Sequence, residues 1–477
     1  MLCKKVSDIK DKYDCVVIGS GLGGLTVANI LAGKFNRKVL LLEQHFKLGG
    51  LATWFERQGH IFDVSLHGFP VGMIKTCRRY WTKEIADSIV QLKNIRFDNP
   101  QFSFSTTFDT KDFSDKMVNN LGVKESVVTD FFQTLKKMDY YNDSSMTVRE
   151  LFEKFFPGRN DVVRLLMEPI TYANGSTLDE PAITYGIVFS NFMSKGVYTF
   201  EGGTDLLIGK MLAELLKNGV DIALSANAES IDIQDSEVRA VVTQGKRILC
   251  SSVVSNCNIV STIKDLIDPI SFSKEFLHDA SQIRINNSSC QVYMGIKEGE
   301  KIEDVGDLIF TSQEPKFEPS KLLDKDTLSR TFSLYYPKTR PGTNRYSIVA
   351  SSNAQYEDWI GLSEEEYRLA KEKLRDDTLK ALEKFIPGVS AKIDYVNVAT
   401  PKTFERYTLH PHGASFGTKF EGLKYSMELD KQISGLFHTG SVGIIMSGWL
   451  GAANYGVITA NKVDKYLYEN INHEGTK

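Results

Sequence analysis

Two short apolar runs organise the beginning of the chain. Residues 13–18 and 38–42 are almost continuously apolar, which is typical of strands buried on both faces of a parallel sheet. Residues 25–31 lie between them and are expected to form a helix. A strand, a helix and a second strand in this order predict one βαβ unit.

The pattern changes twice further along the chain. Residues 112–164 place apolar side chains at helical spacing, so we expect a helical cap there. Residues 282–354 instead alternate and are rich in β-branched and aromatic residues, which predicts a sheet. Residues 362–385 predict a long charged amphipathic helix with a solvated face.

Length and charge narrow the class of protein. A chain of 477 residues is too long for one ordinary core, so we expect two substantial domains or one interrupted by another. Hydrophobic residues make up 42% and charged residues 25%, close to the average of globular proteins. The net charge is -3 and both signs are interspersed, so we expect no nucleic acid partner.

The six cysteines are scattered without a CxxC pair, so neither a disulfide framework nor a zinc site is predicted. This usage fits a reducing cytoplasm. Residues 1–8 lack the apolar region of a secretory signal. The apolar runs are shorter than the ~20 residues that cross a bilayer, so any membrane contact is expected to be peripheral.

A glycine-rich segment directly follows the first predicted strand. Gly19 permits a tight turn, Gly21 lets the backbone approach a pyrophosphate, and Gly24 lets the following helix pack closely. A lone GxGxxG is a weak signal whose alternative is a plain glycine turn. Here a strand, the glycines, a helix, a strand and the terminal acid Glu43 occur in order, which predicts a dinucleotide site. Glu43 suits an adenosine ribose and disfavours NADP.

A second glycine pair, Gly49 and Gly50, follows Glu43, and residues 59–63 then show a Gly-x-x-Phe-Asp pattern. This order resembles the flavoprotein group that includes carotenoid desaturases, carotenoid isomerases, retinol saturase and amine oxidases. Further segments similar to that group are residues 200–204, 251–256, 434–441 and 447–452. Residues 400–407 and 413–417 are closest to its phytoene desaturase and retinol saturase branch.

The resemblance implies noncovalently bound FAD and an α/β fold. It implies a Rossmann-type FAD-binding domain, glutathione reductase-like, interrupted by an α+β substrate domain with a helical cap. The expected parts are a discontinuous FAD-binding domain of residues 1–70, 196–268 and 425–477, a helical cap and substrate region of 71–195, and a sheet-containing substrate domain of 269–424.

The resemblance also suggests which residues contact FAD. These are Gly19, Ser20, Gly21, Leu22, Gly23, Gly24, Glu43, Gln44, Gly49, Gly50, Leu51, Ala52, Leu66, His67, Ala228, Glu229, Ser255, Asn256, Gly440, Ser441, Gly448, Trp449 and Leu450. Two departures stand out: residues 442–446 lack the usual glycine-rich, proline-containing turn, and Ser65 replaces a common glycine. The first leaves the substrate open, and the second shifts the backbone near the flavin.

Few catalytic side chains are expected, because a flavin supplies the hydride chemistry. His67 is a candidate proton relay beside the flavin, and its alternative is a satisfied loop histidine. The sequence His410-Pro411-His412 lacks a third ligand, so we expect a turn and no metal site. With one GxGxxG and no separate nicotinamide unit, electrons are expected to come from the substrate or a diffusing partner.

Residues 172–175 and 185–189 lie where the resembling enzymes line a substrate tunnel, and ordinary core packing is the alternative. Phe189, Phe192 and Met193 are near helical spacing and could meet a membrane or an isoprenoid, although such a stripe is more often core.

The leading hypothesis is an FAD-dependent oxidoreductase that desaturates, saturates or isomerises carbon–carbon bonds of a hydrophobic isoprenoid or polyene, such as a carotenoid or retinoid. One alternative is a flavin amine oxidase, suggested by residues 447–449. Another is a non-enzymatic prenyl-binding escort protein, which the intact Gly21, Gly24 and Glu43 disfavour. Substrate, reaction direction, electron acceptor and oligomeric state stay open.

Overall fold

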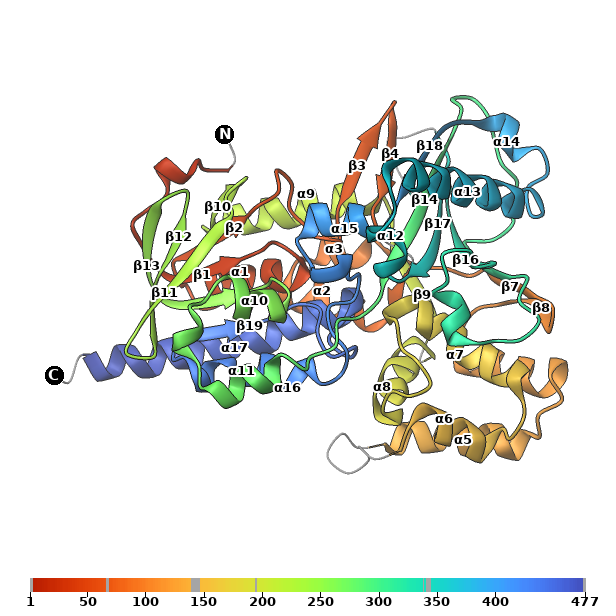
Figure 1. Ribbon diagram of the computed structural model, residues 1–477, viewed down its shortest axis with the longest axis horizontal. Helices are drawn as coiled ribbons and strands as arrows, with labels where there is room; N and C mark the ends of the chain where they lie inside the picture. The colour runs from red at the N-terminus through yellow and green to blue at the C-terminus, as the bar shows by residue number, and fades with distance from the viewer. Residues whose placement is uncertain are drawn as a thin grey trace.

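Two seven-stranded sheets stand side by side in the computed structural model (Figure 1), which describes residues 3–65, 68–138, 146–193, 195–337, 339 and 345–474. The first sheet lies in the half that holds both chain termini, and the second lies in the opposite half above a layer of helices. The chain therefore has a mixed α/β fold.

The first sheet combines strands from three distant parts of the chain. Its order is β10-β2-β1-β13-β12-β11, with β19 also pairing β13. The strands are β1 (Lys12–Ile18), β2 (Val39–Glu43), β10 (Asp221–Leu224), β11 (Ala228–Gln234), β12 (Glu237–Thr243), β13 (Lys246–Ser255) and β19 (Leu436–His438). β10, β2, β1, β13 and β19 are parallel, whereas β11 and β12 pair antiparallel.

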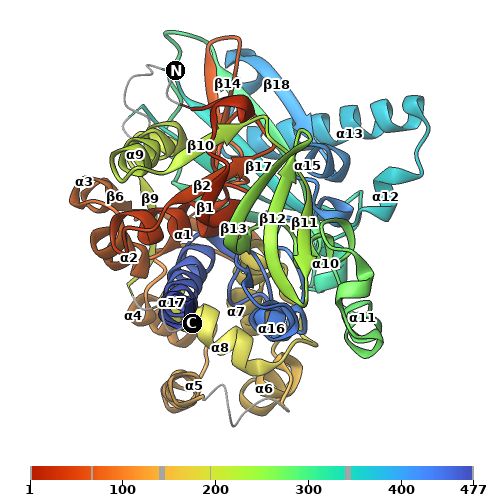
Figure 2. The ribbon, with the colours of Figure 1, turned by 90° about the vertical axis from the view of Figure 1, so that its left-hand side faces the viewer.

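Hydrophobic cores cover both faces of this sheet, as the apolar runs predict. Cys15 and Val17 of β1 join a core with α1 (Leu22–Gly33), α9 (Gly203–Lys217) and α17 (Gly448–Glu474). Val16 and Ile18 join the opposite core, which includes α10 (Ile259–Asp265), α11 (Lys274–Ala280) and α16 (Gly422–Gln432). Figure 2 shows the strands running between α1 and α10.

The second sheet has the order β18-β14-β17-β16-β15-β7-β8. Its strands are β7 (Ile95–Asn99), β8 (Phe102–Thr106), β14 (Ser288–Ile296), β15 (Leu308–Ser312), β16 (Ser329–Tyr335), β17 (Ser347–Ala354) and β18 (Ile393–Ala399). One face packs an apolar core under α13 (Glu364–Glu383), to which Val292, Phe332 and Ile348 contribute. Only β15 and β7 pair in parallel among its described strands.

A helical layer, defined as α4 to α8, packs below the second sheet. Its helices are α4 (Thr110–Asp115), α5 (Glu125–Lys137), α6 (Val148–Phe155), α7 (Asn160–Asn174) and α8 (Ala182–Met193), with the π-helical turn η2 (Lys116–Asn120) after α4. Phe131, Phe152 and Phe189 form part of its core, where Phe113, Tyr185 and Met193 are also buried. Phe189 and Met193 are therefore core residues, as the alternative interpretation predicted, whereas Phe192 of the same stripe is only partly buried against this core.

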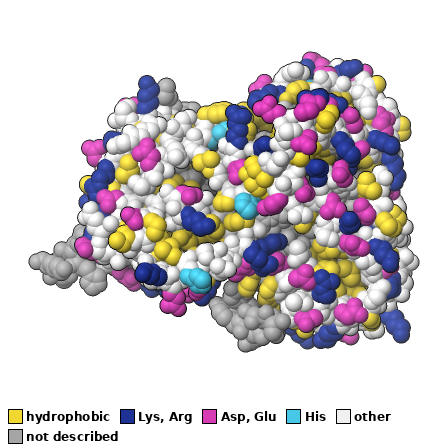
Figure 3. All heavy atoms as spheres, in the orientation of Figure 1, with side chains coloured by type: hydrophobic (Ala, Val, Ile, Leu, Met, Phe, Trp, Pro, Cys, Tyr) yellow, Lys and Arg dark blue, Asp and Glu magenta, His cyan; other side chains and the backbone are white. Residues whose placement is uncertain are grey.

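Shorter elements connect these parts. They are β3 (Trp54–Arg57), β4 (His60–Asp63), β5 (Phe69–Pro70), β6 (Ile89–Gln91), β9 (Val197–Phe200), α2 (Gly72–Tyr80), α3 (Lys83–Asp87), α12 (Glu357–Ile360), α14 (Val389–Lys392), α15 (Pro401–Thr408), η1 (Val6–Asp8), η3 (Pro269–Ser271), η4 (Pro319–Leu322) and η5 (Pro411–Gly413). No helix in the described part of the chain has the length and hydropathy needed to cross a membrane. The face in Figure 3 mixes positive and negative side chains throughout.

Candidate cofactor and substrate cavity

A cavity of about 1140 Å³ reaches from the ends of the first sheet to the second sheet and to α7 and α8. Register explains why residues from four strands meet at its first end. Ile18 of β1 pairs with Leu42 of β2 and with Ser255 of β13, and Ser255 pairs with His438 of β19. Because these strands are parallel, the segments that follow them leave the sheet at one edge, where ligands bind in open α/β sheets.

Glycine residues make the loop between β1 and α1 very tight. Gly19 has φ +94, and its N–H donates to the Leu42 carbonyl at 2.8 Å. A Cβ on Gly21 would lie 2.7 Å from Asn256 Oδ1, and a Cβ on Gly24 would collide with the Gly19 carbonyl. A side chain at position 24 would thus clash with the backbone of the loop, and one at position 21 would displace the Asn256 side chain.

Helix α1 begins directly after this loop. Its N-cap is Gly21, which offers no side-chain hydrogen bond, and its first turn contains no acidic residue. The first amides of a helix lack partners within it, and the helix dipole is positive at that end. The first turn of α1 thus presents N–H groups and partial positive charge to the cavity, which suits a diphosphate.

Glu43 is buried at the end of β2, with 6% of its surface exposed. Its Oε2 accepts hydrogen bonds from the Ser20 N–H at 2.8 Å and the Ser20 hydroxyl at 2.6 Å, while Oε1 accepts from the His45 N–H at 2.8 Å. These bonds fix the carboxylate against the glycine loop. Each oxygen keeps further acceptor capacity for a ligand hydroxyl.

Asn256 lies beside the glycine loop after β13. Its Nδ2 donates to the Thr439 carbonyl at 3.2 Å, while its Oδ1 is buried without a partner among the described residues. The Thr439 hydroxyl is also buried without one. Among the described residues that line the cavity, the lysine and arginine side chains are those of Lys47 and Arg57. The Lys47 Nζ lies 3.5 Å from the centroid of the Trp54 ring.

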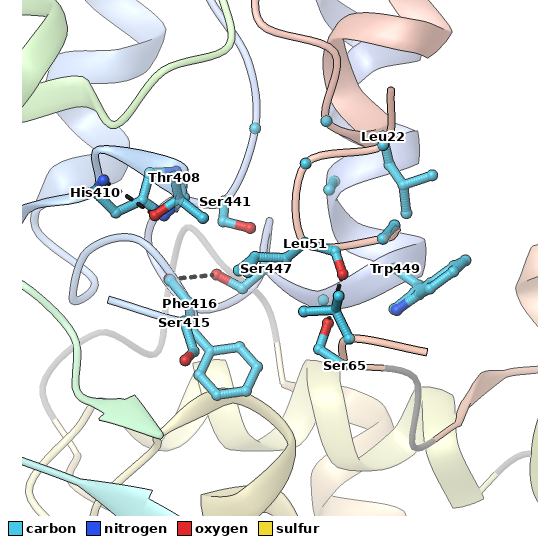
Figure 4. A pocket seen from close by; sticks show the side chains of 18 of the residues that line it. Leu22, Leu51, Ser65, Thr408, His410, Ser415, Phe416, Ser441, Ser447 and Trp449 are labelled. Atoms are coloured by element: carbon cyan, nitrogen blue, oxygen red, sulfur yellow. Dashed lines mark hydrogen bonds between the residues drawn. The ribbon is translucent and has the colours of Figure 1, made fainter. Parts of the chain in front are cut away.

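The start of α17 closes this end of the cavity. Trp449 packs against the rings of Phe69 and Phe200, with centroid separations of 5.9 and 5.7 Å. A Cβ on Gly456 would lie 2.6 Å from the Gly23 carbonyl, so α17 touches the first turn of α1. Figure 4 shows Trp449, Leu22, Leu51 and Ser65 on one side of the cavity and His410, Ser441 and Phe416 on the other.

Hydrogen bonds hold the loops around the cavity. Ser65 Oγ donates to the Leu51 carbonyl at 2.8 Å, and Ser447 Oγ donates to the Phe416 carbonyl at 3.0 Å. His410 lies 3.0 Å by its Nδ1 from the Ala414 carbonyl. Burial lowers the pKa of His410, so the imidazole is neutral at pH 7 and its Nδ1–H donates this bond.

The cavity brings together most residues expected to contact a cofactor. Its lining includes Gly19, Ser20, Gly21, Leu22, Gly23, Glu43, Gln44, Gly49, Gly50, Leu51, Ala52, Ala228, Glu229, Asn256, Gly440, Ser441, Gly448, Trp449 and Leu450. Gly24 and Ser255 do not line it; Gly24 packs against the Gly19 carbonyl, and Ser255 Oγ bonds Thr262 Oγ1 at 2.7 Å. Leu66 and His67 lie outside the described residues, so the proton-relay hypothesis stays a prediction.

The second end of the cavity includes residues that the sequence did not single out. Ser289, Gln291, Thr331, Ser351 and Asn353 of the second sheet line it. The segments 172–175 and 185–189, expected beside a substrate tunnel, reach it in part: Tyr172, Ala173 and Asn174 line it from α7, and Ile187 and Val188 line it from α8, whereas Tyr185 and Phe189 pack in the core. Phe192 of α8 also lines it. The period-2 pattern predicted that these residues of the second sheet lie in strands, but only the pairing of distant strands brings them together.

The two histidines of the His410-Pro411-His412 sequence lie around the turn η5 and have separate surroundings. His412 stacks on the Tyr356 ring with a centroid separation of 5.1 Å, whereas His410 lines the cavity. Within the described residues, no group of three or more His, Cys, Asp or Glu side chains is arranged to hold a metal ion.

Comparison with known families decides the class of this site. Residues 22–441 match the model of a family described as flavin containing amine oxidoreductase. The chain belongs to this family. This family member uses FAD, and the glycine loop, the first amides of α1 and Glu43 fit that cofactor.

Curated relatives of this family member match nearly its whole length. It is 24% identical to prolycopene isomerase of Daucus carota, over 95% of this chain and 80% of that protein. It is 22% identical to all-trans-retinol 13,14-reductase of Danio rerio, over 96% of this chain and 86% of that protein.

Solved structures show the same fold at low identity. An oxidoreductase from Methanosarcina mazei superposes with a TM-score of 0.67 and 15% identity, covering 94% of this chain and all 100% of the other. Putrescine oxidase with bound putrescine superposes with a TM-score of 0.64 and 14% identity, covering 95% of this chain and 99% of the other. At such identities the likeness establishes the fold alone.

Proposed function

We propose that this family member acts on carbon–carbon bonds of a hydrophobic isoprenoid or polyene, by desaturation, saturation or isomerisation. The observation that carries the proposal is one continuous cavity that joins the glycine loop to a chamber between the second sheet, α7 and α8. Full-length similarity to relatives named for prolycopene and retinol favours a polyene substrate.

The domain assignment is part of this proposal. A Rossmann-type, glutathione reductase-like FAD-binding domain comprises residues 1–70, 196–268 and 425–477, because the first sheet takes its strands from these stretches. Residues 71–195 form the helical cap and residues 269–424 the sheet-containing substrate domain. The cavity lies where these parts meet, so the substrate is held against the cofactor.

Different residues at the first end of the cavity bind different parts of FAD. The loop from Gly19 to Gly24 and the start of α1 take the diphosphate, and Glu43 takes the ribose hydroxyls. Gly440, Ser441 and the start of α17 border the flavin ring. Among the described residues, Cys257 is the one cysteine that lines the cavity, and burial raises the pKa of its thiol to about 11, so we propose noncovalent binding.

Bound FAD supplies hydride transfer, so this chain has to orient the substrate and exclude water. Phe416, Trp449 and Leu51 give the middle of the cavity apolar walls. His410 is a neutral imidazole on the wall, able to hold a proton at Nδ1 without adding charge. The electron acceptor or donor stays open.

A flavin amine oxidase is the second candidate, because the family name and the fold neighbour putrescine oxidase point to it. The placement of charged residues in the cavity lining disfavours amine oxidation. The carboxylates of the described lining are Glu43, Glu229 and Asp265, all from elements of the first sheet and α10. The substrate chamber therefore offers no described carboxylate to pair with an ammonium group.

We also propose peripheral contact with a membrane in a reducing, cytoplasmic setting. Phe46, Tyr407, Leu409 and Met427 are 63%, 49%, 55% and 48% exposed and also line the cavity, so apolar side chains surround its entrance. A hydrophobic substrate could pass there from a bilayer. All six cysteines are free.

The test begins with the visible spectrum of the purified protein, and the chromophore is then released by heat and identified by mass. Anaerobic addition of polyenes, retinoids and amines follows, first to oxidised FAD, where bleaching reports oxidation of the compound, and then to pre-reduced FAD, where return of the colour reports saturation. Bleaching by a polyene or retinoid supports the proposal. Bleaching by amines alone, with peroxide release in air, favours amine oxidation, and a colourless protein that cannot be reconstituted favours an escort protein.

A further inference from the structure

Five polar side chains form a continuous patch on the cavity face of the second sheet, here named the polar floor: Ser289, Gln291, Thr331, Ser351 and Asn353. All five line the cavity. The strand register brings them together, because Gln291 pairs with Ser351, Ser351 with Thr331, and Ser289 with Asn353. Three neighbouring strands, β14, β17 and β16, thus place hydroxyls and amides side by side.

The opposite face of the same strands is largely apolar. Val292, Phe332 and Ala350 alternate with the floor residues and pack in the core under α13. The floor residues are just as buried, with exposures of 6%, 2%, 3%, 8% and 3% in chain order. A buried sheet face normally carries apolar side chains, because unpaired polar groups are costly to bury. The polar floor therefore departs from what packing alone favours.

Internal hydrogen bonds satisfy only part of the floor. Ser289 bonds the Ser415 hydroxyl at 2.6 Å, and Asn353 Nδ2 donates to the Thr171 carbonyl at 3.0 Å. Gln291 Oε1, however, is buried with no partner in the described structure. The adjoining cavity wall holds a matching donor, because Asn174 Nδ2 is also buried without a partner and Asn174 is 3% exposed.

We propose that the polar floor binds a neutral oxygen-bearing group of the substrate, a hydroxyl or carbonyl, so that the substrate is an oxygenated isoprenoid and not a plain hydrocarbon. This inference rests on the proposed function and specifies its substrate class. Amides and hydroxyls both donate and accept, as an alcohol requires. The floor contains no charged side chain, so it favours an alcohol or ketone over a carboxylate or an amine.

The test measures binding to the FAD-loaded protein through changes in flavin absorption, under anaerobic conditions. Three ligands share one diterpenoid skeleton: the alcohol, its methyl ether and the hydrocarbon. The key variant is Gln291→Met, which keeps the length of the side chain but removes the amide. For each ligand, the affinity of the variant is compared with that of the unchanged protein. Differences between the ligands in their partitioning into detergent then cancel.

Loss of one hydrogen-bonding group should weaken alcohol binding by roughly five- to tenfold and leave hydrocarbon binding unchanged. The ether, which accepts but does not donate, should show an intermediate loss. Thr331→Val, which replaces a hydroxyl by a methyl of the same shape, should act in the same direction with a smaller factor. Phe310→Leu is the matched control, because this apolar lining residue should affect alcohol and hydrocarbon alike.

Equal effects of Gln291→Met and Thr331→Val on all three ligands would overturn the inference, while binding of the ligands would leave the proposed function standing. Failure of every diterpenoid to bind or bleach the FAD-loaded protein would overturn both. Retained spectra and FAD content in the variants separate a lost contact from a lost fold.

Discussion

The first sheet meets the cavity mainly with backbone, whereas the second sheet meets it with side chains. At the first sheet, the start of α1 presents N–H groups beside a glycine loop in which a Cβ on Gly21 or Gly24 would come too close to neighbouring atoms. At the second sheet, Gln291 and Asn353 present amides from strand interiors. A cofactor shared by many enzymes can be held by backbone geometry, but a particular substrate requires particular side chains.

The largest expected effect comes from a substitution in the glycine loop at the first sheet. Gly21→Val places a branched side chain where even a Cβ lies 2.7 Å from Asn256 Oδ1, so FAD should no longer be retained. FAD content after gel filtration is the measurement. The control is Gly209→Val, since Gly209 has open space around it. Full retention of FAD in Gly21→Val would refute the placement of the diphosphate.

The next effect concerns the buried polar network that supports the carboxyl edge of the first sheet. His438 Nε2 donates to the Cys257 carbonyl at 2.9 Å, and its Nδ1 accepts from Ser426 Oγ at 2.6 Å. Burial lowers the pKa of His438 from 6.5 to about 4. The unfolded chain binds this proton first, so stability is complete above pH 6.5 and declines as the pH falls toward 4.

This shift corresponds to roughly 3 kcal/mol of unfolding free energy across that interval. Denaturant unfolding at several pH values measures it, and His438→Gln serves as the comparison because it cannot titrate. The unfolding free energy of His438→Gln should therefore lack this part of the pH dependence. Identical pH dependence in the two proteins would show that His438 does not carry the effect.

A smaller effect is expected from Glu43→Ala. FAD affinity should fall by about 1.5 to 3 kcal/mol, because a charged hydrogen-bonding group is lost. Part of this loss comes from the loop, since Ser20 and His45 lose their acceptor. Glu43→Gln keeps an oxygen for one of these bonds, so its FAD affinity should lie between that of Glu43→Ala and that of the unchanged protein. Titration of the apoprotein with FAD gives the values, and unchanged affinity would detach Glu43 from the ribose.

The smallest effect should come from the second sheet. Ser351→Ala removes one hydroxyl of the polar floor and should leave FAD affinity unchanged, with less than about 1 kcal/mol change in unfolding free energy. The same FAD titration and denaturant unfolding measure both. A marked loss of FAD would show that the floor holds the cofactor, and the contrast between the sheets would then fail.

The contrast also explains what could be predicted from the sequence. The glycine loop is a local signal: Gly19, Gly21 and Gly24 follow a strand and precede a helix within a few residues. The structure places helix α1 and strands β1 and β2 where the pattern predicted them, with α1 starting earlier at Leu22. Helices between residues 112 and 164, strands between 282 and 354 and helix α13 also fall where expected.

The polar floor could not be predicted, because its residues meet through pairing of strands far apart in the chain. Nothing near Gln291 in the sequence indicates that Ser351 lies opposite it or that Thr331 follows. The parallel pairing of β15 with β7 joins Leu308 to Ile95 and is equally nonlocal. Alternation predicts which residues share a strand face, but strand order decides which faces meet.

The contact between Gly456 and the Gly23 carbonyl has a consequence for biosynthesis. The glycine loop between β1 and α1 leaves the ribosome long before α17, the helix that packs against it. Domains generally fold as units during or after synthesis. The nascent chain therefore cannot complete this end of the cavity until α17 has emerged, so we expect FAD to bind only after that point.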